Sequence, residues 1–543
     1  LANQINSGSL PFALSAESYS TISPSLGAKS LDVMVQAGII AFILVAILMI
    51  VRYRLPGTIA VISLMGQAAA TLAVVSGYFT VFPGSTLTLP GIAGIILGIG
   101  MGVDANVITA ERIKEELSKN KTLEGAVNSG FKMGLTPIID GNVTIVIVAA
   151  ILMGAFGPTD GFWAKVFNPI FYWFGPSTAG TIYSFGFTLL TSVLLNFVFG
   201  VWATRVMIRG AVHFKPLRKA WLFGGKKEGG ADFKTPSINF IGNRKKFYTF
   251  SCALIAVVLV FCGIFGVKMD VEFKGGSMIT LAYEGDADLN DLKSTIGTEL
   301  GKSNLTLQTG SDISGNQTLT VTLPGSDTLT TEQLDNLLTA LNEQYPDNKF
   351  VQNEVSNVDA TIGKEFLVKS VVALVAACVL ILLYVAYRFR KIGGLKAGST
   401  AIVALLHDMF VVFGVFVLLR IPLNGNFIAA LLTILGYSIN DTVVIYDRIR
   451  ENSALYGKKQ MSLAELVNLS VNQSFARSLM TSITTCLALG VVCVVSVIYR
   501  LDSIYSFAFP LLFGMVSGVY STICIATPLW VDWKNKKKAA KKA

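Results

Sequence analysis

Long apolar runs constrain this chain more than any other feature of its sequence. A helix needs about 20 apolar residues to cross a membrane, because every backbone polar group must be satisfied within the lipid. About eleven such runs are present, near residues 33–51, 58–80, 89–110, 136–156, 180–208, 248–268, 366–387, 398–419, 425–446, 478–498 and 503–530. Charged residues make up 14% of the chain, against roughly 25% in soluble proteins. The sequence therefore predicts a mostly α-helical, multi-pass membrane protein.

The cysteines indicate neither a disulfide framework nor a metal site. All six fall inside the apolar runs, where we expect small buried side chains: Cys252, Cys262, Cys378, Cys486, Cys493 and Cys524. We therefore predict no metal and no cofactor.

Basic clusters beside the apolar runs set the expected orientation of the chain. Eleven Lys or Arg residues lie between Arg205 and Lys246, and the tail "KNKKKAAKKA" carries six lysines. Positive charge of this kind is retained on the cytoplasmic side, where anionic lipids attract it. No aromatic residues alternate with the lysines of the tail, as a base-stacking surface would require. The net charge of +10 therefore indicates membrane lipids, and not nucleic acid, as a partner.

The segment 270–360 has the opposite charge and is expected on the outer side. It carries fifteen Asp or Glu residues against four Lys residues. Its patterns predict strands at 277–283, 305–309, 318–323 and 349–358, and helices at 288–300 and 330–345. A turn is expected at 310–317, and Thr330 with Gln333 has the capping-box spacing. The order βαββαβ predicts an α/β ferredoxin-like extracytoplasmic domain, a fold that identifies no function by itself.

The membrane part contains an internal repeat. "GMGVDANVITAERIKEEL" (100–117) aligns with "GYSINDTVVIYDRIRENS" (436–453), and "NSGFKMGLTP" (128–137) aligns with "NQSFARSLMT" (472–481). In the first alignment the matched pairs are Gly100 with Gly436, Asp104 with Asn440, Glu111 with Asp447 and Arg112 with Arg448. We therefore expect two pseudo-repeated helical bundles of the same orientation, related by a two-fold axis along the membrane normal.

Three charged residues lie deep within the apolar runs or beside them: Asp104, Asp441 and Arg477. Asp104 follows 49 uncharged residues, 55–103, and Asp441 follows 20 uncharged residues, 421–440. A charge at the centre of a membrane helix costs roughly 2.5–3.5 kcal/mol, and such residues usually mark ion or proton paths. The alternative is a snorkelling carboxylate or a packing hydrogen bond between helices. We favour a proton site, because an acidic residue recurs at nearly the same depth in both repeats.

Further polar residues accompany these three, and we expect them to support the site: Glu111, Arg112, Asp140, Asp408, Asp447 and Arg448. For Asp140, Asp408 and the neighbouring His407, an ordinary hydrogen bond between helices explains the sequence equally well.

Two long stretches resemble a known family. "LPGIAGIILGIGMGVDANVITAERIKEEL" (89–117) is similar to the signature span of SecD, and "NFIAALLTILGYSINDTVVIYDRIREN" (426–452) to that of SecF. "FKGGSMIT" (273–280) resembles the start of the SecF extracytoplasmic domain, and "PSLGAKSLD" (24–32) the end of the SecD one. The likeness covers nearly the whole chain, in the order of SecD and SecF fused in one polypeptide, which are relatives of the RND transporters.

The resemblance implies a non-enzymatic role in the Sec protein-export machinery of the bacterial cytoplasmic membrane. Its implied partners are a SecYEG-type translocon channel, YidC- or YajC-type accessory proteins and unfolded preproteins. Proton flow through the membrane part would move the extracytoplasmic part and so promote export. The family's proton site falls on Asp104, Asp441 and Arg477. Because the family pattern has one more span and a large domain ahead of residues 1–30, we expect a longer protein upstream.

This interpretation divides the chain into seven parts. They are the end of the SecD-like extracytoplasmic domain (1–30), a SecD-like transmembrane bundle (31–212), a basic cytoplasmic linker (213–246), the first SecF-like span (247–268), the SecF-like extracytoplasmic domain (269–362), a SecF-like transmembrane bundle (363–533) and a basic cytoplasmic tail (534–543). The aromatic stretch 161–175 is expected at the membrane interface.

Two other classes of protein stay open as alternatives. An RND-type exporter of small molecules or lipids usually carries two much larger outside domains. An intramembrane aspartyl protease requires a glycine–x–glycine–aspartate spacing, which neither "GMGVD" nor "GYSIND" meets.

Overall fold

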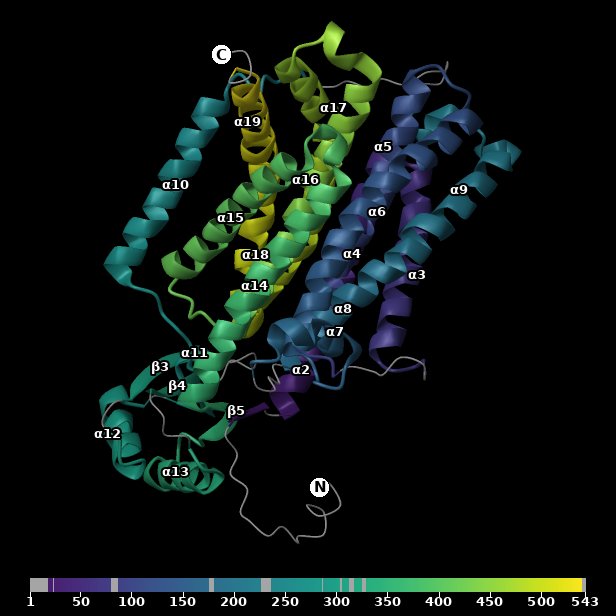
Figure 1. The fold of residues 1–543 in the computed structure, drawn as a ribbon. Helices are drawn as coiled ribbons and strands as arrows, with labels where there is room; N and C mark the ends of the chain where they lie inside the picture. The colour runs from purple at the N-terminus through teal and green to yellow at the C-terminus, as the bar shows by residue number, and fades with distance from the viewer. Residues whose placement is uncertain are drawn as a thin grey trace. The chain divides into compact units, whose positions relative to one another are not determined.

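The computed structural model describes residues 18–22, 24–79, 86–174, 180–225, 236–285, 287–302, 305–311, 317–324 and 329–539 (Figure 1). Eleven helices within these ranges are long and apolar enough to cross a membrane, which confirms the predicted number. The chain forms two compact units, which we treat separately. One combines the described parts of Leu1–Ser30 with Met269–Val368, and the other combines Leu31–Lys268 with Lys369–Ala543.

The first half of the membrane unit contains α2 (Pro24–Tyr53), α3 (Leu55–Val75), α4 (Leu89–Gly102), α5 (Asp104–Ser118), α6 (Leu123–Phe156), α7 (Phe162–Phe171), α8 (Gly180–Asn196) and α9 (Thr204–His213). The second half contains α10 (Arg244–Phe265), α14 (Ala360–Arg388), α15 (Gly394–Leu418), α16 (Gly425–Gln460), α17 (Leu463–Ile498), α18 (Asp502–Ser521) and α19 (Thr527–Ala539). Short 3₁₀ turns lie at Lys215–Leu217, Ala220–Phe223 and Arg390–Ile392. Helices α4 and α5 form one span, and its only irregularity is at Val103.

The two halves repeat each other in packing and in local geometry. Helix α4 packs against α17 of the other half, and the related helix α16 packs against α6. The last span of each half contains a π-helical segment, Phe197–Ala203 in one and Thr522–Ala526 in the other. In both, the next threonine hydroxyl donates to a carbonyl five residues back, at 3.1 Å for Thr204 and 2.7 Å for Thr527. These matched features support the predicted pair of pseudo-repeated bundles.

Glycines allow the signature span of the first half to pack closely against α8. A Cβ atom on Gly91, Gly94 or Gly98 would lie 2.5 Å from the hydroxyl of Ser184, Thr188 or Ser192, respectively. Small residues at helix contacts let membrane helices approach closely, because packing and hydrogen bonds replace the hydrophobic driving force. The run "GIAGIILG" therefore places α4 in the buried centre of the bundle.

The second unit is the predicted ferredoxin-like domain. Its elements are α11 (Val271–Lys274), β2 (Gly276–Tyr283), α12 (Leu289–Glu299), β3 (Thr306–Ser311), β4 (Gln317–Pro324), α13 (Thr331–Gln344) and β5 (Val351–Val358). The sheet order is β1-β5-β2-β4-β3 with antiparallel pairing throughout, and the βαββαβ order is confirmed. The predicted turn at 310–317 lies mostly outside the described residues.

Apolar alternation and helix capping explain why this segment folds as it does. The inward positions Leu281, Leu319 and Leu337 are fully buried in one core. At the start of α13 the backbone N–H of Gln333 donates to Thr330 Oγ1 at 3.2 Å. The backbone N–H of Thr330 donates in return to Gln333 Oε1 at 3.0 Å, which confirms the capping box.

An additional strand comes from the N-terminal segment. Strand β1 (Ser18–Ile22) pairs antiparallel with β5, from Ser18 opposite Val358 to Ile22 opposite Glu354. The sequence "SYSTI" is too short and too polar to predict this pairing. The described part of 1–30 therefore extends the sheet of the ferredoxin-like domain.

Candidate proton site

The two positions matched by the repeat meet in the centre of the bundle. Asn440 Nδ2 of α16 donates a hydrogen bond to Asp104 Oδ2, at the start of α5, at 2.9 Å. These residues are 336 positions apart, which is the period of the repeat. The contact therefore crosses the interface between the two halves at equivalent points of each.

Gly141 of α6 makes room for this contact. A Cβ atom at position 141 would lie 1.7 Å from Asn440 Oδ1, which no side chain tolerates. The absence of a side chain at Gly141 thus permits Asn440 to reach Asp104.

We expect Gly141→Ala to displace the Asn440 side chain and break its hydrogen bond to Asp104. A hydrogen bond to a charged group contributes about 1.5–3 kcal/mol, so a marked loss of site function should follow. Gradient-dependent export by the variant checks this. The control is Gly490→Ala, also in a membrane helix, where an added Cβ meets no atom within 4 Å. Equal export by the two variants would contradict the prediction.

Arg477 and Asp441 complete the predicted trio. Both are buried, at 7% and 8% exposure, on the neighbouring helices α17 and α16. The charges of Asp104, Asp441 and Arg477 are close enough to interact electrostatically. Arg477 Nε nevertheless has no hydrogen-bond partner among the residues that the structure describes. The site thus contains two carboxylates and a buried guanidinium that is not bound tightly to either.

Hydroxyl groups extend from the trio along α17. Tyr437, one turn before Asp441, donates its phenol hydrogen to Thr485 Oγ1 at 3.0 Å. Thr485 Oγ1 donates to the carbonyl of Thr481 at 3.0 Å, and Thr481 Oγ1 to that of Arg477 at 3.2 Å. These residues recur every four positions, so they share one face of the helix. The polar face of α17 is therefore directed at α16, the helix that carries Asp441.

Four predicted supporting residues lie toward the predicted cytoplasmic ends, and each has an ion-pair partner: Glu111, Arg112, Asp447 and Arg448. Glu111 binds Arg52 at 3.0 Å and accepts a hydrogen bond from the Tyr53 hydroxyl at 3.1 Å. Its repeat partner Asp447 pairs instead with Arg450 on its own helix. Glu111 therefore anchors a helix end, whereas Asp447 is also close enough to Arg477 to interact with its charge.

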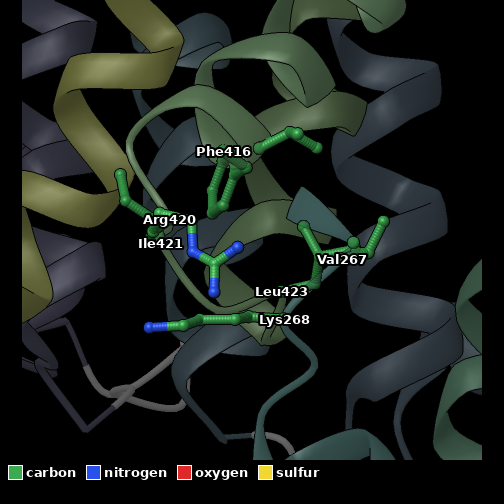
Figure 2. Close-up of a pocket in the computed structure, with 8 residues that line it drawn as sticks. Val267, Lys268, Phe416, Arg420, Ile421 and Leu423 are labelled. Atoms are coloured by element: carbon green, nitrogen blue, oxygen red, sulfur yellow. The ribbon is translucent and has the colours of Figure 1, made fainter. Parts of the chain in front are cut away.

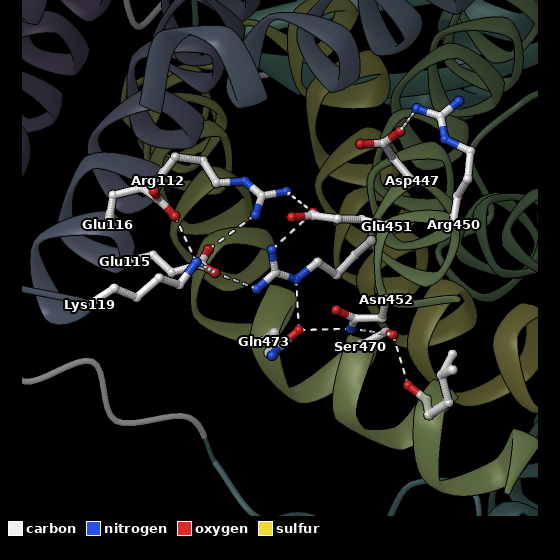
Figure 3. A network of polar contacts seen from close by, with 12 residues as sticks. Arg112, Glu115, Glu116, Lys119, Asp447, Arg450, Glu451, Asn452, Ser470 and Gln473 are labelled. Atoms are coloured by element: carbon white, nitrogen blue, oxygen red, sulfur yellow. Dashed lines mark hydrogen bonds and ion pairs between the residues drawn. The ribbon is translucent and has the colours of Figure 1, made fainter. Parts of the chain in front are cut away.

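Arg112 and Arg448 meet two glutamates that the sequence analysis missed, Glu115 and Glu451 (Figure 3). A signal was present, because "RIKE" and "RIRE" place both glutamates at the same repeat spacing as the arginines. The alignment of 100–117 with 436–453 already places Glu115 opposite Glu451, three residues after the arginines.

Asp140 makes contacts between the two halves with residues that are not part of the trio. Its Oδ1 accepts from Arg388 Nε at 2.7 Å and from the Tyr384 hydroxyl at 3.1 Å, both on α14. Such contacts fit the packing explanation given for this residue.

Asp408 is also held by hydrogen bonds between helices. It is fully buried and accepts from Ser438 at 2.7 Å, Ser517 at 2.5 Å and Ser521 at 2.7 Å. His407 Nδ1 lies 3.3 Å from its Oδ1. Three hydroxyl donors satisfy this carboxylate, so it too is explained by packing of α15, α16 and α18.

A small recess in the membrane unit lies where the end of α10 meets the α15–α16 connection, away from the trio (Figure 2). Arg420 donates to the carbonyl of Phe265 at 2.5 Å, and the N–H of Leu423 donates to the carbonyl of Lys268 at 2.9 Å. The recess has no free volume for a ligand, so it serves as a structural joint. Within the described ranges no cluster of three or more His, Cys, Asp or Glu side chains is arranged to hold a metal.

Two pseudo-repeated bundles, buried charges at their interface and a ferredoxin-like domain define a class of polytopic membrane protein. The family described as "Protein export membrane protein SecD/SecF, C-terminal" matches residues 4–164 and 338–536. The chain belongs to this SecD/SecF family, with its SecD-like and SecF-like halves in one polypeptide, and it is a multi-pass protein of the cytoplasmic membrane.

Individual relatives agree with this assignment. The protein translocase subunit SecDF of Bacillus subtilis is 31% identical, over 99% of this chain and 69% of its own length. The crystal structure of SecDF from Thermus thermophilus matches with a TM-score of 0.78 at 30% identity, over 97% of this chain and 66% of that one. The hedgehog release protein Disp of the water bear, at 11% identity and a TM-score of 0.55, shares the fold alone. The chain thus spans about two thirds of the length of its SecDF relatives.

Proposed function

We propose that this chain belongs to an accessory subunit of the Sec protein translocase that uses the proton motive force to promote preprotein export. The observation that carries the proposal is the Asn440–Asp104 hydrogen bond between the two repeats, with Asp441 and Arg477 close enough to Asp104 to interact with its charge. The names of the relatives as translocase subunits support the export role. A SecYEG-type channel, YidC- or YajC-type proteins and unfolded preproteins are the partners that fit it.

A proton would change the charge balance of the trio by one unit. With both carboxylates ionised, Arg477 is shared between them, and protonation of one leaves a single anion for it to pair with. Because the carboxylates sit on α5 and α16, a change of partner by Arg477 would pull one half against the other. Each proton that crosses supplies roughly 2.3 kcal/mol per 100 mV of membrane potential, which is sufficient to bias two packings of similar energy.

The direct test uses membrane vesicles with the intact full-length protein present or depleted. Release of a reporter preprotein is followed at saturating ATP, with the proton gradient intact or collapsed by an ionophore. We expect the protein to accelerate release only while the gradient is present. Equal acceleration with the gradient collapsed would contradict the proton-driven role, and no acceleration in either condition would favour an exporter of other substrates.

A further inference from the structure

Four charged side chains, three of them buried and Glu451 half-buried, form a closed ring between α5 and α16 (Figure 3). Arg112 lies 3.1 Å from Glu115 on its own helix and 2.8 Å from Glu451 on the other. Arg448 lies 3.0 Å from Glu451 on its own helix and 2.7 Å from Glu115 on the other. Every member therefore has one partner within its helix and one across the interface.

The ring follows the same internal repeat as the proton site. Its arginines are 336 residues apart, as are its glutamates and the Asp104–Asn440 pair. Both arginines come eight residues after that pair, roughly 12 Å along each helix toward the predicted cytoplasmic end. Between the two polar layers, Ile108 and its repeat partner Val444 belong to one buried apolar cluster. Along these two helices, the apolar pair therefore lies between the Asp104–Asn440 contact and the ring.

This arrangement allows the interface between α5 and α16 to open without leaving any of the four charges unpaired. Removing one partner of a buried ion pair costs about 3–5 kcal/mol, because an uncompensated charge remains. If α5 and α16 move apart, the two pairs across the interface break, while Arg112–Glu115 and Arg448–Glu451 persist within their helices. Glu115 also keeps Lys119, 3.2 Å away. The ring therefore has two arrangements in which every charge is paired.

The ring is also connected to the helix that carries Arg477. Arg448 Nε donates to Gln473 Oε1 of α17 at 2.7 Å, and Asn452 Nδ2 donates to the same oxygen at 2.8 Å. Gln473 precedes Arg477 by four residues, so both lie on one face of α17. A displacement of Arg477 would be transmitted to the ring through this contact.

We propose that Arg112, Glu115, Arg448 and Glu451 form the cytoplasmic gate of the proton site, closed here and opened when the two halves separate. This inference rests on the proposed proton-driven function and adds where access to the site is controlled. The closed ring and the Ile108–Val444 layer exclude cytoplasmic water from Asp104. Opening would admit water to the site from that side.

A charge exchange on one helix tests the gate. Arg448→Glu combined with Glu451→Arg preserves the pair within α16 but makes both contacts across the interface repulsive. Adding Arg112→Glu and Glu115→Arg restores opposite charges at all four contacts within the ring, although Lys119 then faces an arginine at position 115. Access is measured at Ala105→Cys, which is next to Asp104 and 1% exposed, in a full-length protein from which all native cysteines have been replaced.

A membrane-impermeant maleimide is added from the cytoplasmic side and the rate of labelling of Cys at position 105 is measured. With the two-residue exchange we expect labelling about tenfold faster, which corresponds to a change of about 1.4 kcal/mol in the opening equilibrium. With the four-residue exchange we expect the parental rate. Unchanged labelling with the two-residue exchange, or fast labelling with all four, would overturn the gate. If the two-residue exchange on α16 does not accumulate, the equivalent exchange on α5 alone gives the same test. Labelling needs no export, so failure of the gate is distinguishable from failure of the proton-driven function.

Discussion

Asp104→Asn is expected to abolish the gradient-dependent part of preprotein export while the protein stays in the membrane at its normal level. Asparagine has nearly the same shape and still forms a hydrogen bond with Asn440, so packing at the interface is retained. It cannot take up or release a proton, and removal of a membrane carboxylate eases insertion. Secretion of a reporter at saturating ATP, with the gradient present or collapsed, measures the effect in the full-length protein. Asp441→Asn and Arg477→Ala should lose the same component of export.

The matched control is Asp140→Asn, the same change at a buried carboxylate of the bundle that lies outside the trio. Its Oδ1 accepts from Arg388 and Tyr384, contacts that belong to packing. We expect this variant to retain gradient-dependent export. If Asp104→Asn retains it as well, the assignment of Asp104 to a proton site is wrong and the packing explanation holds there too.

Arg388→Met should cause a large loss of stability in the membrane unit. Arg388 Nε lies 2.7 Å from Asp140 Oδ1 and neutralises this carboxylate, whose side chain is only 5% exposed. Removing the arginine leaves a buried carboxylate with the Tyr384 hydroxyl as its remaining described partner, at a cost of about 3–5 kcal/mol. Thermal unfolding of the detergent-solubilised protein measures the change.

The double variant Arg388→Met with Asp140→Asn separates charge from packing. The neutral asparagine needs no counter-charge and still accepts from Tyr384, so we expect most of the stability to return. A double variant as unstable as Arg388→Met alone would show that the methylene stem of Arg388, and not its charge, stabilises the contact between α6 and α14.

Sequence reasoning succeeded where a local pattern determines a local structure. The eleven spans follow from runs of apolar residues, because a chain in lipid can satisfy its backbone only as a helix. The capping box at Thr330 and the alternation in 277–283 act over a few residues, so they are visible without a fold. The repeat placed Asp104 and Asn440 at equivalent depths, and the structure shows that they touch.

Other features depended on neighbours that no periodicity identifies. A helical period indicates which residues share a face, but not which helix that face meets. Asp140 was thus predicted to support the site, whereas its partners are Tyr384 and Arg388 of the other half. Strand β1 was missed because its pairing is with a strand more than 300 residues away.

The sequence by itself determined the number of spans, the two repeated halves and the ferredoxin-like order of strands and helices. It also identified the charged residues whose burial in the membrane is energetically unfavourable. Tertiary structure alone decided how those residues combine. Gly141 matters only because Asn440 of another helix occupies the space where its Cβ would be. The Arg112 and Arg448 pairs close into a ring only because α5 and α16, which both pack against α6, come within reach of each other's long side chains. Local propensity acts along the chain, whereas a buried charge is stabilised by whichever partner the packing of distant helices brings within a few ångströms.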